Sequence, residues 1–264
     1  MLDTIKKHLD DKMSIEEKTH LVREDLQIII LKILYDLGMF KAMAFVGGTA
    51  LRILFDLKRF SEDLDFSITQ DKGYDFNKLS QDLQYQLEKY GLNVNIKENA
   101  QNTVQNIMLR FKDILSSLGL SLVKSQKLSV RLEIDTNPPV GWKTDISLIN
   151  KMIAFTVVHY DMPSLYASKL CACFFRKYVK GRDFYDLVWY LGKKIMPNFE
   201  LLNNAVRQID SHSTLITEHN FKEYLKTQLA KIDFSSVRKD VERFLVDKGE
   251  LKLLDKDLIV QLIK

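Results

Sequence analysis

Hydrophobic residues along the chain follow two patterns, one typical of strands and one typical of helices. In the first 160 residues, short apolar or alternating runs predict strands at 43–46, 63–68, 93–97, 104–111, 127–136 and 153–158. In the same part, helical spacing predicts helices at 14–37, 49–56 and 74–90. From Ser164 onward the spacing is almost wholly helical, with predicted helices at 164–178, 183–193, 197–209, 218–231, 234–247 and 255–263. This order predicts an α+β domain followed by a helical domain, with a boundary near residue 160.

Local signals mark both ends of the first long helix. Ser14 followed by Glu17 is the pattern of a capping box, which satisfies backbone N–H groups at a helix start. Gly38 follows the last periodic residue, as is usual where a helix ends. The continuous apolar stretch Leu26–Leu34 indicates that this helix lies in the core rather than on the surface.

The most informative segment is Phe45–Ile68, which reads FVGGTALRILFDLKRFSEDLDFSI. Its glycine pair, Gly47 and Gly48, precedes Thr49 at a predicted strand-to-helix turn. Glycine is favoured where the backbone takes a positive φ or approaches another group closely. A helix start with free N–H groups and a nearby hydroxyl suits a phosphate. The turn is therefore a candidate phosphate site.

Two carboxylates, Asp63 and Asp65, stand two residues apart in the next predicted strand. Side chains at this spacing point to the same face of a strand. Two carboxylates side by side repel each other unless a cation lies between them, and their oxygen ligands suit Mg²⁺. A phosphate site and paired metal carboxylates on neighbouring elements predict chemistry on nucleotides.

These motifs resemble those of the nucleotidyltransferase superfamily related to DNA polymerase β, whose signature is a Gly-Gly-Ser/Thr turn followed by Asp-x-Asp. The sequence GGTALRILFDLKRFSEDLDF is similar to the abortive-infection toxin branch, the AbiEii/AbiGii type that includes the MenT toxins. The resemblance is strongest over Val46–Phe66, and the C-terminal tail carries little of it. It implies a polymerase-β-like nucleotidyltransferase core with N-terminal helices over 1–160, a mixed sheet with flanking helices. A helical domain over 161–264 would complete the active site.

The resemblance also implies a reaction. An NTP would place its phosphates against Gly47–Thr49, and one or two Mg²⁺ ions on Asp63 and Asp65 would assist transfer of the nucleoside monophosphate with release of pyrophosphate. The implied acceptor is RNA, most specifically the 3′ end of a tRNA, whose modification blocks translation. A toxin of this kind implies a cognate antitoxin, with or without a stable complex.

A third carboxylate is expected in the segment Lys127–Pro139, KLSVRLEIDTNPP. Its alternation places Arg131, Glu133 and Asp135 on one strand face. By resemblance, Glu133 or Asp135 is a further metal carboxylate that orients or deprotonates the attacking hydroxyl. The alternative is a charged sheet face on which Arg131 pairs with its acidic neighbours, and the sequence leaves both open.

The resemblance further points to Lys169 and Asp183 as active-site residues. Lys169 lies in the apolar helix LYASKLCACFF, where a lone ammonium is out of place, and a triphosphate would explain it. The alternative is a salt bridge from Lys169 to Asp183. Asp183 follows Gly181 and could equally cap a helix. Asp186, one turn later, is interpreted as structural.

The arginines between and around the motifs have open roles. Arg59 contacts a phosphate or braces Asp63 through an ion pair. Arg52, one turn inside the helix after Thr49, is an alternative phosphate contact but is better interpreted as a surface residue. A later basic run faces a triphosphate or an RNA backbone, or it forms a solvated helix end; its members are Arg176, Lys177, Lys180 and Arg182.

Bulk properties agree with a cytoplasmic enzyme. The chain has 264 residues, of which 46% are hydrophobic and 28% charged, and this is typical of a soluble globular protein. The net charge of +4 permits a nucleic-acid partner without requiring one. Cys171 and Cys173 diverge on a helix, so buried reduced thiols are expected. We expect no signal peptide and no transmembrane helix.

Several other enzyme classes lack their sequence signatures. The five histidines show no zinc-ligand spacing, and neither a P-loop nor a Gly-x-Ser-x-Gly motif occurs. Three functions therefore compete: a toxin that modifies tRNA, a nucleotidyltransferase that modifies a small molecule or a protein, and a catalytically silent nucleotide-binding module. The intact glycine turn and Asp-x-Asp pair argue against the silent module.

Overall fold

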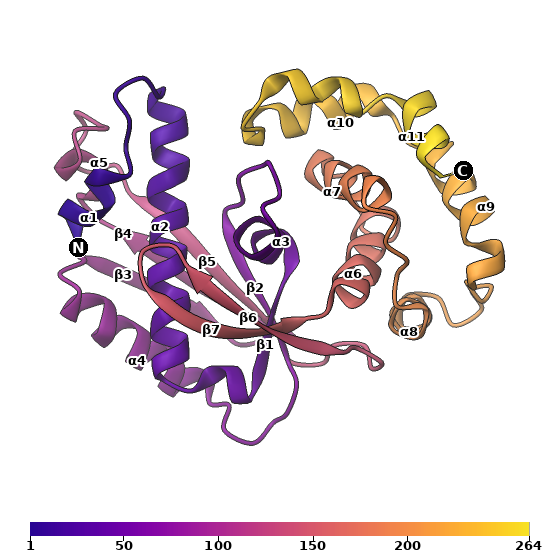
Figure 1. Ribbon diagram of the computed structural model, residues 1–264. Helices are drawn as coiled ribbons and strands as arrows, with labels where there is room; N and C mark the ends of the chain where they lie inside the picture. Colours follow the sequence, from indigo (N-terminus) through magenta and orange to yellow (C-terminus); the bar gives the residue numbers. More distant parts are fainter. Residues whose placement is uncertain (264) are drawn as a thin grey trace. The chain divides into compact units, whose positions relative to one another are not determined.

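Seven strands form one mixed sheet in the order β3-β4-β5-β2-β1-β7-β6 (Figure 1). The computed structural model describes residues 1–263. The strands are β1 (Met43–Val46), β2 (Asp63–Ile68), β3 (Val94–Asn99), β4 (Val104–Phe111), β5 (Leu128–Asp135), β6 (Thr144–Asn150) and β7 (Ala154–Tyr160). β1 runs antiparallel to β2 and parallel to β7, and β2 runs parallel to β5. The central strands β1, β2 and β5 therefore carry both sequence motifs and the predicted third carboxylate.

The chain divides into two compact units. Unit 1 consists of residues 1–54, 60–137 and 146–159, and it holds nearly the whole sheet. Unit 2 consists of residues 55–59, residues 138–145 and the chain from Tyr160 onward. The mixed α+β fold with helices at the C-terminal end confirms the fold class predicted from the sequence.

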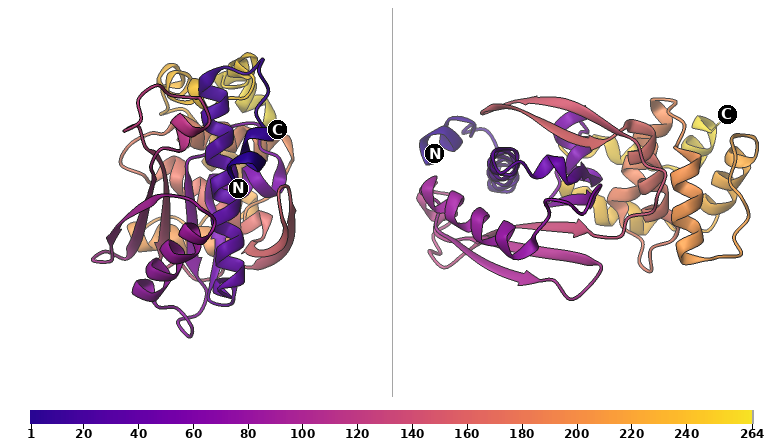
Figure 2. Two further views of the ribbon diagram at one scale, coloured as in Figure 1. Left: turned by 90° about the vertical axis from the view of Figure 1, so that its left-hand side faces the viewer. Right: turned by 90° about the horizontal axis from the view of Figure 1, so that it is seen from below.

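The long helix α2 is the central helix of unit 1. The helices of this unit are α1 (Leu2–Lys7), α2 (Ile15–Asp36), the 3₁₀ turn η1 (Met39–Lys41), α3 (Gly47–Phe55), α4 (Phe76–Lys89) and α5 (Ile114–Ser117). The predicted capping box is present, because the Ser14 side chain accepts from the Glu17 N–H and the Glu17 side chain accepts from the Ser14 N–H. Seen from below in Figure 2, α2 is end-on, with the β6–β7 hairpin on one side and β3 and β4 on the other. Its apolar residues from Ile28 to Leu34 are almost all buried.

Helices alone build most of unit 2. They are α6 (Met162–Phe174), α7 (Gly181–Gly192), α8 (Phe199–Ile209), α9 (Glu218–Leu229), α10 (Phe234–Val241), η2 (Glu242–Phe244), η3 (Lys248–Leu253) and α11 (Lys256–Leu262). α7 packs against α6, α10 and α11. Tyr166 and Tyr190 stack in this core with ring centroids 4.3 Å apart. α7 and α10 approach closely at Gly181, where an added Cβ would lie 3.0 Å from the Val241 backbone nitrogen.

Some predicted elements differ from the observed ones. β6, α1 and α5 were not predicted, and the predicted helix 234–247 breaks after Val241 into a 3₁₀ turn. β6 was not predicted from the alternation of apolar and polar residues, because apolar residues occupy both of its faces. Ile146 and Leu148 are 66% and 63% exposed, whereas Ile149 is buried.

The two cysteines are free thiols, as predicted. Burial raises the pKa of the Cys171 thiol to about 12 and raises that of Cys173 well above its usual value. Both side chains are therefore protonated and unreactive at neutral pH. Among the described helices, none combines the length and apolar character that a membrane span requires.

A buried carboxyl on α2 makes the stability of unit 1 depend on pH. Burial, aided by the nearby Glu24, raises the pKa of Asp25 to about 6, although His8 and Lys151 act in the opposite direction. His8 Nδ1 lies 3.1 Å from the Asp25 carboxylate. Because this pKa is higher in the folded protein, the contribution of Asp25 to stability is fully present below the unfolded value of 3.8 and is lost as the pH rises through about 6.

Asp25→Asn removes this ionisation. Relative to the native protein, the variant should gain on the order of 2 kcal/mol in unfolding free energy between pH 4 and pH 7. Urea unfolding of both proteins at the two pH values measures the difference. A constant difference across this range would show that Asp25 does not carry the effect.

Candidate active site

The glycine turn and the Asp-x-Asp strand touch each other directly. Gly47 begins α3 immediately after β1 and has a φ of +78°. A Cβ at this position would lie 2.8 Å from Cγ of Asp65, closer than real Cβ contacts allow. Val46, the preceding residue, pairs with Asp65 across β1 and β2. Glycine is therefore required at position 47 for two reasons, its left-handed backbone and the Asp65 carboxylate packed against it.

Thr49 joins the same two elements from the helix side. Its side chain is fully buried, and its hydroxyl donates to the carbonyl oxygen of Asp63. Because the hydroxyl proton already forms this hydrogen bond, we interpret Thr49 as a residue that positions the start of β2. Binding of a nucleotide by Gly47, Gly48 and Thr49 stays a prediction.

Gly47→Ala tests the contact between the two motifs. The added Cβ should strain the left-handed backbone by about 1–2 kcal/mol and displace Asp65, which should lower activity on the order of 10²-fold. Gly38→Ala is the matched control, since Gly38 has a φ of +71° but no atom within 4 Å of the added Cβ. It should cost similar stability and leave activity unchanged. Thermal unfolding and the rate of nucleotide transfer give the two readouts, and equal activity losses in both variants would contradict the prediction.

Four carboxylates share one face of the paired strands β2 and β5. Asp63 and Asp65 alternate with buried residues on β2, as Glu133 and Asp135 do on β5. In the parallel register, Asp65 stands beside Glu133, whereas Asp135 stands beside Ser67. Glu133 is thus the neighbour of the Asp-x-Asp pair. Asp135 lies one step further, where burial raises its pKa and its carboxylate accepts from the Asn137 N–H at 3.0 Å.

A cationic side chain lies between two of these carboxylates. Arg131 Nη1 lies 2.9 Å from Glu133 Oε1, and its Nε lies 3.9 Å from Asp63 Oδ1. Arg131 therefore pairs with its acidic neighbours, one of the two alternatives that the sequence left open. Burial alone would lower the pKa of Arg131, but Asp63 and Glu133 outweigh it and raise the pKa. The carboxylates on this face therefore stabilise a positive charge placed beside them.

The donor atoms on this face suit Mg²⁺. They are carboxylate oxygens from two adjacent strands, the hard ligands that this ion prefers, and the Arg131 guanidinium already lies against two of them as a positive charge. Within residues 1–263, no three acidic, histidine or cysteine side chains are already gathered as a metal site. The residue types and the strand register fit the ion.

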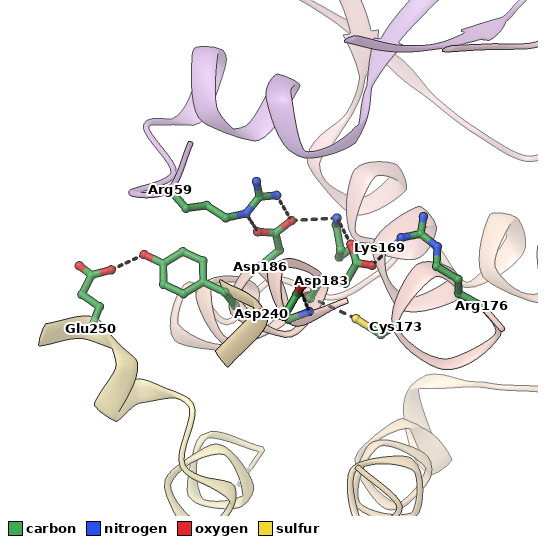
Figure 3. A network of polar contacts seen from close by, with 10 residues as sticks. Arg59, Lys169, Cys173, Arg176, Asp183, Asp186, Asp240 and Glu250 are labelled. Carbon is green, nitrogen blue, oxygen red and sulfur yellow. Dashed lines mark hydrogen bonds and ion pairs between the residues drawn. The ribbon is translucent and has the colours of Figure 1, made fainter. Parts of the chain in front are cut away.

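In unit 2, Lys169 and Asp183 belong to a buried network of charges (Figure 3). Lys169 Nζ lies 2.8 Å from Asp183 Oδ1 and 2.8 Å from Asp186 Oδ2. Arg59 holds Asp186 through two hydrogen bonds of 2.6 Å, from Nε and Nη2. Arg176 Nη1 lies 2.9 Å from the other Asp183 oxygen. Each carboxylate is thereby shared by two cations.

The network keeps Lys169 and Asp183 charged despite their burial. Burial alone would lower the pKa of Lys169, but Asp183 and Asp186 outweigh it and raise the pKa. Burial alone would raise the pKa of Asp183, but Lys169 and Arg176 outweigh it and lower the pKa. The salt bridge from Lys169 to Asp183, which the sequence offered as the alternative to phosphate binding, is present. The roles of both residues in catalysis, and of Lys169 in phosphate binding, stay predictions.

Two sequence interpretations change at this network. Asp183 does not cap α7, because Lys180 is the N-cap residue and the Gly181 N–H at the helix start donates to Asp240 Oδ2 at 2.7 Å. Asp183 lies in the first turn, where its negative charge also suits the helix dipole. Arg59 has a partner that the sequence did not indicate, Asp186, which is 127 residues further along. The structural interpretation of Asp186, which is 0% exposed, agrees with this contact.

Arg52 is not the surface residue that the sequence indicated. Its side chain is only 13% exposed, and its Nε lies 2.8 Å from Glu24 Oε2. Glu24 also accepts from Lys151 Nζ at 2.6 Å. Burial alone would raise the pKa of Glu24, but Arg52 and Lys151 outweigh it and lower the pKa. Glu24 was not predicted from the sequence as a residue near the site. The available signal was an acidic side chain within a predicted core helix.

A family model described as the nucleotidyl transferase AbiEii toxin of type IV toxin–antitoxin systems matches residues 29–257. No curated protein matches the chain.

Two crystal structures of Helicobacter pylori proteins are similar. JHP933 is 23% identical with a TM-score of 0.52, over 92% of this chain and 91% of that one. A candidate nucleotidyltransferase is 21% identical with a TM-score of 0.51, over 97% of this chain and 96% of that one. At these identities the two structures support the fold alone.

Proposed function

Because the chain belongs to the AbiEii family of nucleotidyl transferase toxins from type IV toxin–antitoxin systems, we propose that it transfers a nucleoside monophosphate from an NTP to RNA. The acceptor we propose is the 3′ end of a tRNA, and the consequence is a block of translation in the cytoplasm. The observation that carries this proposal is the close packing of Asp65 on the Gly47 turn, with Glu133 beside Asp65 in the sheet register. This packing places the proposed phosphate-binding turn next to the carboxylates of β2 and β5.

The residues of unit 1 have distinct tasks in the proposed reaction. Backbone N–H groups of the first turn of α3, from Gly47 to Thr49, bind the phosphates of the donor. Asp63 and Asp65 hold one or two Mg²⁺ ions, with Glu133 as the third carboxylate. An ion held by these carboxylates would supply positive charge that offsets the phosphate charge as pyrophosphate leaves. Glu133 orients the attacking hydroxyl and accepts its proton.

Lys169 and Asp183 are also proposed as catalytic residues, and Lys169 and Arg59 as phosphate-binding residues. The network of Arg59, Lys169, Arg176, Asp183 and Asp186 contains one more cation than carboxylates. This excess of positive charge suits a triphosphate. Arg176, whose side chain is 40% exposed, can change partners most readily.

The family implies an antitoxin partner and a nucleotide substrate. Transfer to a small molecule or a protein is the second candidate function, since the carboxylate face serves any hydroxyl acceptor equally well. Purified protein, Mg²⁺ and each α-phosphate-labelled NTP in turn, incubated with total tRNA, distinguish the two. Label in tRNA from one nucleotide supports the proposal, and label only in protein or a small molecule supports the second function. No transfer to any acceptor would contradict both.

A further inference from the structure

We infer that the polar residues of α2 are positioning residues for the metal carboxylates, an inference that rests on the proposed function. The residues are His20, Arg23, Glu24 and Gln27. His20, Arg23 and Gln27 contact the irregular segment 60–62, which leads directly into Asp63, and Glu24 acts through Arg52. None of the four was singled out as a site residue by the sequence.

Each of the three residues before Asp63 is held by a different side chain of α2. The His20 ring stacks on Phe60 with centroids 4.6 Å apart and an interplanar angle of 7°. Gln27 Nε2 donates to the Ser61 carbonyl oxygen at 3.1 Å. Arg23 Nη1 lies 3.5 Å from Glu62 Oε1. One helix therefore fixes the path of the chain immediately before the metal-binding strand.

Arg52 extends this support to the glycine turn. Its guanidinium lies 5.0 Å from the centroid of the Phe60 ring, which His20 also contacts. Glu24 holds Arg52, and Lys151 from the β6–β7 connection holds Glu24. Since Arg52 lies on α3, the helix that starts at Gly47, the same buried network links the α3 helix to the segment before Asp63.

Arg23 also reaches the strand of the third carboxylate. Its Nε donates to the Ser129 carbonyl oxygen on β5 at 3.4 Å, and Glu133 lies further along the same strand. The Arg23 side chain thus contacts both the segment that leads into β2 and the beginning of β5. Any shift of α2 would change the position of Asp63 relative to Glu133.

Core packing alone does not account for polar groups at these positions. Burying a polar side chain costs free energy unless it forms a hydrogen bond, and Gln27 is 1% exposed. Ordering an irregular backbone costs about 1–2 kcal/mol per residue. The polar residues of α2 supply the contacts that hold segment 60–62 in one conformation, so that Asp63 is already placed before an ion binds.

Mn²⁺ binding tests this inference independently of catalysis. Free Mn²⁺ is measured by electron paramagnetic resonance with the full chain and a non-hydrolysable NTP analogue present. Gln27→Met keeps the side-chain length but removes the donor to Ser61, and Glu24→Gln weakens the hold on Arg52. Both should weaken Mn²⁺ binding by about 10-fold or more, and added Mg²⁺ should restore transfer activity. A folding defect would not be restored by added metal.

Asp25→Asn is the matched control, because Asp25 lies on the same helix and is buried but contacts His8 instead. It should leave Mn²⁺ affinity within about twofold of the native value. The inference is overturned if Gln27→Met binds Mn²⁺ like the native protein, or if Asp25→Asn weakens binding equally. If Asp65→Asn also binds Mn²⁺ like the native protein, the proposed metal site itself is wrong. If Glu24→Gln does not fold, Gln27→Met still decides the question.

Discussion

Asp65→Asn is expected to lower nucleotidyl transfer on the order of 10³-fold while leaving the fold intact. The substitution removes the negative charge that lies against the Gly47 turn and beside Glu133, and an amide is a poor substitute for a carboxylate as an Mg²⁺ ligand. Stability should not fall, because one member of a like-charged group is neutralised. Transfer from a labelled NTP and thermal unfolding give the two measurements.

Asp135→Asn is the control on the same sheet face. Asp135 pairs with Ser67 in the register and not with either residue of the Asp-x-Asp pair, so its loss should have a much smaller effect on the rate. Near-native transfer by Asp65→Asn would remove the basis of the proposed mechanism. Equal losses in the two variants would instead make Asp135 a metal carboxylate.

The second large effect is expected on stability, at Asp186. Asp186→Asn leaves Arg59 and Lys169 buried beside a neutral group, although both now contact the carboxylate at 2.6 and 2.8 Å. Removing one partner of a buried ion pair costs about 3–5 kcal/mol, because the remaining charge is uncompensated. Urea unfolding at pH 7 should show this loss as a lower midpoint.

A surface pair provides the comparison for Asp186. Asp36 lies 2.5 Å from Lys32 one turn earlier on α2, but its side chain is 50% exposed. Exposed pairs of this kind contribute about 0–1 kcal/mol, so Asp36→Asn should hardly change the unfolding midpoint. An Asp186→Asn variant as stable as Asp36→Asn would show that the buried network contributes little to unit 2.

The sequence predicted those parts of the fold that depend on local pattern. β1, β2 and β4 have the predicted bounds because each is a short apolar or alternating run. β6 has apolar residues on both faces and gave no such pattern. The fold class followed from the order of elements, which needs no knowledge of which strands pair.

Only those features of the site that depend on residues close together in the sequence could be predicted. Spacing alone placed Asp63 and Asp65 on one face. Glu133 and not Asp135 pairs with Asp65, and this difference depends on the β2–β5 register, which is set by strand pairing across the sheet. The contacts of Arg59 with Asp186 and of Arg52 with Glu24 join distant parts of the chain, and no local pattern encodes them.

The division into two units limits how the chain can be separated into independent pieces. Residues 55–59 lie between two stretches of unit 1 but belong to unit 2, where Arg59 binds Asp186. A single cut near residue 160 therefore cannot yield two complete pieces. The C-terminal piece would lack Arg59, and the Asp186 carboxylate would lose its bidentate partner. Exchange of the helical unit between related proteins therefore requires the short segments 55–59 and 138–145 to be exchanged together with it.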